Sequence, residues 1–300
     1  MNNINFKHSL IFFNFCILIS PLFYKFIKNE PILLCLFLIL IIGISHGSLD
    51  NIKGKKLLEY FGYKSEYIFY LAYLMISFFI ILFWLFFPII VLSLFLIVAG
   101  YHFGKEDTVF SIKRKKIAKE ILFFLKGSSV IFAPLLFQRE ATNEIFKILN
   151  YDLFEKSFFN DNTLFIFLFL GFISSIYLTH KKSPEHKALI IMDFFSIIIL
   201  NFFLTPVVAF TLYFCFLHSI RHSITLIFEL DKLFKKGFEK FMIKAFPLTL
   251  ITGLIFLITI FFLNNNIELN EAIYMVIFIG LASLTFPHIL LEYLLEKNEK

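Results

Sequence analysis

Ten apolar runs of roughly bilayer length follow one another along the chain, separated by short polar segments. A helix needs about 20 mainly apolar residues to cross a bilayer. We therefore expect an all-α, polytopic transmembrane helix bundle of about ten helices, eight being the lower bound, that forms a single integral membrane domain over residues 1–300. The predicted spans are 9–25, 31–48, 67–86, 88–104, 119–137, 163–180, 188–204, 206–228, 242–263 and 271–295.

Basic residues concentrate in alternate connections between these spans. The connections after the second, fourth, sixth and eighth spans hold four, six, three and five Lys or Arg residues, whereas the alternate connections hold five in all. Basic connections face the cytoplasm in most membrane proteins. The pattern predicts that both termini are cytoplasmic. It also explains the net charge of +6, so we expect no nucleic-acid partner.

Composition agrees with a multi-pass protein of the cell (inner) membrane. The chain is 59% hydrophobic and 17% charged, whereas soluble domains are about a quarter charged. The first apolar run lacks a small-residue cleavage site, so we interpret it as a retained helix. The three cysteines lie in apolar segments without a CxxC pair, which argues against disulfides and zinc knuckles.

Five histidines are predicted to lie at one depth of the bilayer. Each belongs to a span that runs from outside to inside, roughly 18–24 Å from its outer end at about 1.5 Å per residue. They come from four different spans, so we expect them to share a layer near the cytoplasmic side. They are His46, His102, His218, His222 and His288.

The spacing of His218 and His222 favours a metal site within this layer. Residues at i and i+4 lie on one helical face, where two imidazoles can bind a single ion while neighbouring helices supply the other ligands. The HxxxH spacing alone fits a structural pair of histidines equally well. Further histidines at the same depth make metal binding the better interpretation.

Carboxylates follow the histidines closely. Asp50, Glu106 and Glu292 each come four residues after a histidine, and Asp107 comes five after His102. A metal-bound imidazole usually donates its second N–H to a carboxylate or carbonyl, which fixes its tautomer. We expect Asp50, Glu106 and Asp107 to support the imidazoles in this way, and we interpret Glu292 as an ordinary residue of the membrane interface.

Arg221 and Asp193 are further ionisable residues inside predicted spans. Charged groups at such depth are paired and often functional. We expect Arg221 to pair with one of the carboxylates beside the histidines, and Asp193 to support the site or to pair with Lys126. The remaining histidines fall at or beyond the ends of spans and are interpreted as surface residues: His8, His180 and His186.

Several neutral imidazoles suit Fe(II), Zn or Cu better than Mg or Ca. A hydrolytic zinc site usually shows a general base beside its ligands, as in HExxH, and the sequence has no such motif. An Fe(II) ion bound by four histidines keeps positions open for O₂, which indicates an oxygenase with a lipid-soluble substrate. The alternative is a polytopic transporter or a haem-binding electron-transfer protein.

Three segments carry a resemblance to a known family. "SHGSLD", "YHFGKED" and "FLHSIRHS", in this order in a chain of this length, resemble the Brp/Blh family, the bacterial and archaeal membrane-bound β-carotene dioxygenases that supply retinal to rhodopsins. The resemblance covers essentially the whole chain.

This resemblance implies a reaction and a set of ligands. The reaction is cleavage of the central 15,15′ double bond of β-carotene by O₂, giving two all-trans-retinal, with a microbial rhodopsin as the expected recipient. The implied Fe(II) ligands are His46, His102, His218 and His222. The resemblance assigns no role to His288, whose depth predicts support of the site or cavity lining. A wholly apolar substrate should enter sideways between helices, through a tilted or curved tunnel.

Overall fold

The computed structural model describes residues 2–26, 30–63, 65–108, 117–150 and 160–298, with the backbone alone described at residues 2, 3, 26 and 46. All the regular elements in these ranges are helices. Ten helical segments among them are long and apolar enough to cross a membrane. The predicted all-α bundle of about ten spans is therefore confirmed.

Seven of the ten spans are formed by single helices and three by composite segments. The elements are α1 (Asn2–Phe26); α2 (Ile32–Leu38) with η1 (Ile39–Gly43), η2 (Ile44–Leu49) and α3 (Asp50–Tyr60); α4 (Tyr67–Phe86); α5 (Pro88–Glu106); α6 (Ile117–Gly127) with α7 (Ser129–Phe137); α9 (Asp161–Thr179); α10 (Pro184–Phe203); α11 (Pro206–Leu212) with η4 (Tyr213–Ser219) and α12 (Ile220–Leu230); α13 (Phe234–Leu263); and α14 (Leu269–Asn298). Helices α1, α13 and α14 each contain a proline.

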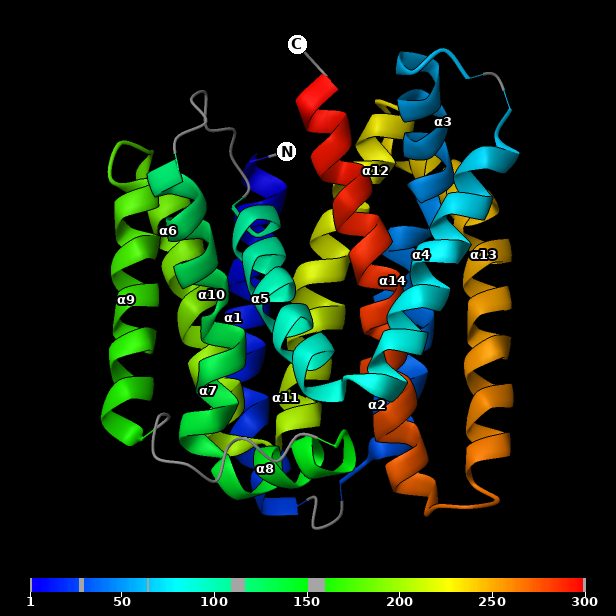
Figure 1. Ribbon diagram of the computed structural model, residues 1–300. Coiled ribbons are helices and arrows are strands. Elements are labelled where there is room, and N and C mark those ends of the chain that lie inside the picture. The colour runs from blue at the N-terminus through cyan, green and yellow to red at the C-terminus, as the bar shows by residue number, and fades with distance from the viewer. Residues whose placement is uncertain (1, 27–29, 64, 109–116, 151–159, 299–300) are drawn as a thin grey trace.

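The spans alternate in direction. Helix α1 begins and α14 ends at the same end of the bundle, which is also where α3 and α12 lie (Figure 1). Both described chain ends thus lie on the side of the basic connections, as an even number of spans requires. That this side is cytoplasmic stays a prediction.

Two helical segments were not predicted. Helix α8 (Arg139–Ile148) lies in the predicted connection between the fifth and sixth spans, across the end of the bundle opposite the termini (Figure 1). It forms because it buries one apolar side, including Ile145 and Phe146, against the bundle. The second span likewise continues past its predicted end through α3, whose first turn carries Asp50; an acidic residue there stabilises a helix start.

Three segments depart from α-helical geometry where the predicted spans carry histidines. Segment η1 is a π-helix and η2, which contains His46, is a 3₁₀-helix, while η4, which contains His218, is a second π-helix. A π turn changes which residues share a face, and such turns are frequent at functional sites. The segments also contact one another: a Cβ at Gly43 would lie 2.6 Å from the Phe214 ring.

Glycines bring the end of α5 against α6. A Cβ at Gly104 would lie 1.7 Å from the carbonyl oxygen of Phe123, and one at Gly127 would lie 2.0 Å from the carbonyl oxygen of Gly100. Small residues allow such close approach of membrane helices. This contact fixes the end of α5 that carries His102 and the two acids after it.

We expect Gly104→Ala to destabilise the protein, because the added methyl group overlaps backbone that a side-chain rotation cannot move. Overpacking of this kind costs about 1–3 kcal/mol. The measurement is the apparent melting temperature in detergent micelles. Gly253→Ala is the matched control, since nothing lies within 4 Å of its added Cβ. Equal melting temperatures for the two variants would contradict the close α5–α6 contact.

Candidate metal centre

Four imidazoles meet near the end of the bundle that carries the chain termini. His102 comes from α5, His218 from η4, His222 from α12 and His288 from α14. The ring centroids are 5.2 Å apart for His102 and His218, 5.3 Å for His102 and His288, and 6.2 Å for His222 and His288. The structure thus brings together four of the five histidines that the sequence places at one depth.

His46 lies in η2, which contacts α13, α12 and η4. Its side chain is outside the described residues. Its place among the ligands therefore stays a prediction from the resemblance.

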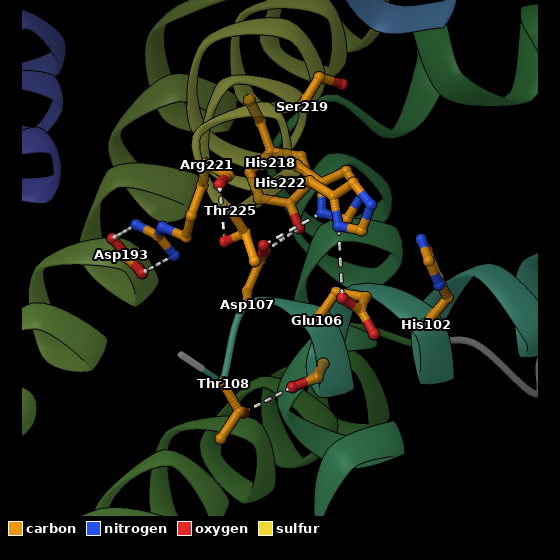
Figure 2. A network of polar contacts seen from close by, with 12 residues as sticks. His102, Glu106, Asp107, Thr108, Asp193, His218, Ser219, Arg221, His222 and Thr225 are labelled. Carbon is orange, nitrogen blue, oxygen red and sulfur yellow. Dashed lines mark hydrogen bonds and ion pairs between the residues drawn. The ribbon is translucent and has the colours of Figure 1, made fainter. Parts of the chain in front are cut away.

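Carboxylates at the end of α5 support the two histidines of the HxxxH pair: Glu106 is the last residue of α5 and Asp107 follows it. The Asp107 Oδ1 atom lies 3.0 Å from His218 Nδ1, and Glu106 Oε2 lies 3.4 Å from His222 Nδ1. Figure 2 shows both carboxylates directed toward the two rings. Asp107 is 6% exposed and also accepts a hydrogen bond of 2.6 Å from the Tyr213 hydroxyl. Both acids therefore support histidines of another span and not His102, the histidine of α5.

Asp50 supports a different histidine in the same manner. Its two carboxylate oxygens lie 2.9 and 2.8 Å from His288 Nδ1, and Oδ2 accepts a hydrogen bond of 3.0 Å from the Tyr73 hydroxyl. Sequence reasoning missed both tyrosines. Tyr73 and Tyr213 lie 23 and 106 residues from their carboxylate partners, so no local spacing could reveal them.

Glu292 belongs to the cluster, and its interpretation as an interfacial residue is wrong. Its side chain is 13% exposed, and its two oxygens lie 4.0 Å from His102 Nδ1 and 3.9 Å from His288 Nε2. His102, His288 and Glu292 each offer a ligand atom within 4.8 Å of the others. Lys53 also binds Glu292, at 2.7 Å.

Arg221 does not pair with the carboxylates beside the histidines, so that prediction is wrong. Its guanidinium donates two hydrogen bonds to Asp193, of 2.7 and 3.0 Å, and a third to Ser9. Arg221 pairs with Asp193 because its side chain extends toward α10, away from the imidazoles of His218 and His222 (Figure 2). Nor does Asp193 bind Lys126, whose ammonium group donates to Thr108 Oγ1 instead.

The other histidines lie apart from the cluster. His180 is exposed next to the end of α9 and His186 lies in the first turn of α10, partly exposed. The surface interpretation is wrong for His8, because its Nε2 lies 2.8 Å from the Phe216 carbonyl oxygen in a partly buried position.

The donor chemistry of the cluster fits a transition-metal ion. In His218, His222 and His288 the Nδ1 atom faces a carboxylate, which is the usual second partner of a metal-bound imidazole. Imidazole donors of this kind suit Fe(II), Zn and Cu. The residues therefore fit an Fe(II) ion.

A small internal cavity lies on the other side of Asp107. Its volume is about 20 Å³, and it is lined by Asp107, Lys126, Asp193 and Tyr213 among others. That volume holds a single water molecule and is far too small for a carotenoid. The curved substrate tunnel thus stays a prediction.

The comparison with known families decides which family the chain belongs to. The model of the beta-carotene 15,15′-dioxygenase family matches residues 37–296. The chain belongs to this family. It is also 29% identical over 270 residues to the beta-carotene 15,15′-dioxygenase of uncultured marine bacterium 66A03, covering 85% of this chain and 90% of that protein. No solved structure matches. All four clustered histidines of this dioxygenase-family chain lie inside the matched region.

Proposed function

We propose that this dioxygenase-family protein cleaves the central 15,15′ double bond of β-carotene with O₂ and releases two all-trans-retinal. In this proposal Fe(II) is bound by His46, His102, His218 and His222. The observation that carries it is the meeting of imidazoles from separate spans, at 5.2 Å between the His102 and His218 rings, in a chain of the family. That membership favours the oxygenase over the transporter and the haem protein.

The protein residues orient the ligands. Asp107 accepts the Nδ1–H of His218 and Glu106 approaches Nδ1 of His222, so the Nε2 side of each ring faces the centre. A carboxylate in this place fixes the neutral tautomer and raises ligand basicity. When bound, Fe(II) would supply the activation of O₂ that the protein side chains lack.

Two aromatic side chains pack against His218. The Phe103 ring lies 4.9 Å from the His218 ring, and the Phe214 ring stacks on His218 at 5.9 Å and 14°. These apolar faces exclude water from the centre and offer a surface to a flat polyene. Positioning the central double bond against the centre, and no other, would determine where cleavage occurs.

The substrate and the product both belong in the lipid phase. We propose that β-carotene enters between helices of an inner-membrane protein whose α3 and α12 end faces the cytoplasm, and that a microbial rhodopsin receives the retinal. The ten long apolar helices support the multi-pass location. The basic connections on that end support the orientation. Because the cluster lies nearer that end, the carotene must lie tilted or curved.

Expression in bacterial cells that accumulate β-carotene tests the proposal. We expect the orange colour to fade under aerobic, iron-replete growth, with two retinal molecules formed per β-carotene lost, measured by chromatography of cell extracts. Cells carrying an empty vector are the control. Persistent colour in cells whose membranes contain the protein would contradict the proposed reaction. So would products of unequal length, because they would show cleavage away from the centre.

A further inference from the structure

We propose that His288 is an additional ligand of the iron centre, held in place by Asp50 and Tyr73. This inference rests on the proposed function, since it concerns the same centre. It extends the ligand set beyond the four histidines that the resemblance implies, and it replaces the expectation that His288 only supports the site or lines a cavity.

The structure builds the same histidine support twice. In one case the Tyr213 hydroxyl donates to Asp107, which holds His218 Nδ1 at 3.0 Å. In the other, the Tyr73 hydroxyl donates to Asp50, which holds His288 Nδ1 at 2.8 Å. The two chains of contacts use different helices and have no residue in common.

Both supported rings are turned in the same way with respect to the cluster. Each presents Nδ1 to its carboxylate, and each lies beside His102, at ring-centroid distances of 5.2 Å for His218 and 5.3 Å for His288. With metal–nitrogen bonds of about 2 Å, two imidazoles on one ion have their centroids roughly 4.5–6.5 Å apart. His288 meets this condition toward His102 and also toward His222, at 6.2 Å.

Burying the ionisable groups of His288 and Asp50 costs free energy. His288 and Asp50 are each 4% exposed, and a buried carboxylate is expensive unless it is paired and hydrogen-bonded. A helix that only needed to pack there would use an apolar residue. Ionisable groups inside membrane helices are therefore functional by default, and the function nearest to His288 is the metal centre, because its ring lies 5.3 Å from the His102 ring.

The test compares metal binding by the wild type, His288→Ala and Asp50→Asn, each purified without oxygen and stripped of metal. Fe(II) affinity is measured by competition with a coloured chelator, and the optical spectrum of the Co(II)-loaded protein reports the number of ligands. We expect His288→Ala to lower Fe(II) affinity by more than about 100-fold and to change the Co(II) spectrum. For Asp50→Asn, which removes the carboxylate that holds His288, we expect the Fe(II) affinity to fall about 10–100-fold.

His180→Ala is the matched control, because His180 is exposed next to the end of α9 and should change neither quantity. The melting temperature of the metal-free protein distinguishes a metal ligand from a residue that only packs. If His288 only packs, His288→Ala lowers this melting temperature and leaves the Fe(II) affinity unchanged. Wild-type affinity and spectrum in His288→Ala would overturn the inference while leaving the proposed function intact. If His288→Ala does not fold, a wild-type Fe(II) affinity of Asp50→Asn would likewise overturn the inference. A wild-type protein that binds no Fe(II) would overturn both.

Discussion

Replacing His218 by Ala should abolish iron binding and β-carotene cleavage in a protein that still inserts into the membrane. His218 is 1% exposed, lies beside His102 and is held by Asp107, so removing it deletes a buried ring that a carboxylate holds within the cluster. Metal catalysis supplies several kcal/mol of transition-state stabilisation, so we expect cleavage to fall roughly 1,000-fold or more. The measurement is retinal formed per minute by purified protein, together with iron per chain.

His222→Ala should behave in the same way, because Glu106 holds His222 and the two histidines share one ion in the proposal. The control is again His180→Ala, which removes an imidazole that lies away from the cluster. Cleavage at the wild-type rate by His218→Ala or His222→Ala would show that the replaced histidine is not a metal ligand.

The largest effect on stability should come from Arg221→Met. Arg221 is 2% exposed and Asp193 4% exposed, and they form two hydrogen bonds. Removing the cation leaves a buried carboxylate uncompensated, which costs about 3–5 kcal/mol. The double variant Arg221→Met/Asp193→Leu should regain most of that loss, because neither charge remains. The measurement is unfolding in mixed micelles of the wild type, both single variants and the double variant, which gives the coupling free energy of the pair.

Arg139→Met is the matched control for this experiment. Arg139 pairs with Asp161 at the surface, where the two side chains are 41% and 76% exposed. Exposed pairs contribute at most about 1 kcal/mol. If Arg221→Met cost no more than Arg139→Met, or if the double variant were no more stable than the single one, the buried pair would not have the role that its geometry indicates.

The ten spans could be predicted because the bilayer constrains a chain more strongly than water does. A segment that crosses it must be apolar for about 20 residues and must satisfy its own backbone, which leaves the helix as the solution for such runs. Helix α8 was not predicted because its apolar residues occupy one side only, so it does not form a continuous apolar run. The continuation of the second span as helix α3 was not predicted because the chain becomes polar at residue 50, and α3 forms although it contains Gly54.

The depth of the histidines could also be predicted, whereas their partners could not. Depth follows from counting residues along a helix. A partner depends on which helices are neighbours: Asp50 lies four residues after His46 in the sequence, yet it binds His288, 238 residues away. The π turns of η1 and η4 make the partners still harder to predict. They change which residues share a helix face, and a count of about 3.6 residues per turn no longer applies.

Arg221 illustrates the same limit. Its burial and its need for an acid followed from its place in an apolar run. Which acid it binds depended on whether its helix turns that side toward α5 or toward α10, and the structure shows the latter. Sequence patterns thus identified the groups that need partners, and the packing of the spans selected the partners.

The most direct measurement is the iron stoichiometry of the wild-type protein, reconstituted with Fe(II) without oxygen and then given β-carotene and O₂ in a single turnover. The arrangement of the imidazoles predicts one tightly bound iron per chain and two retinal molecules per β-carotene consumed, both lost together when the metal is removed and regained when Fe(II) is restored. Retinal formation at an unchanged rate by the metal-free protein, or a wild-type protein that retains no iron, would contradict the account.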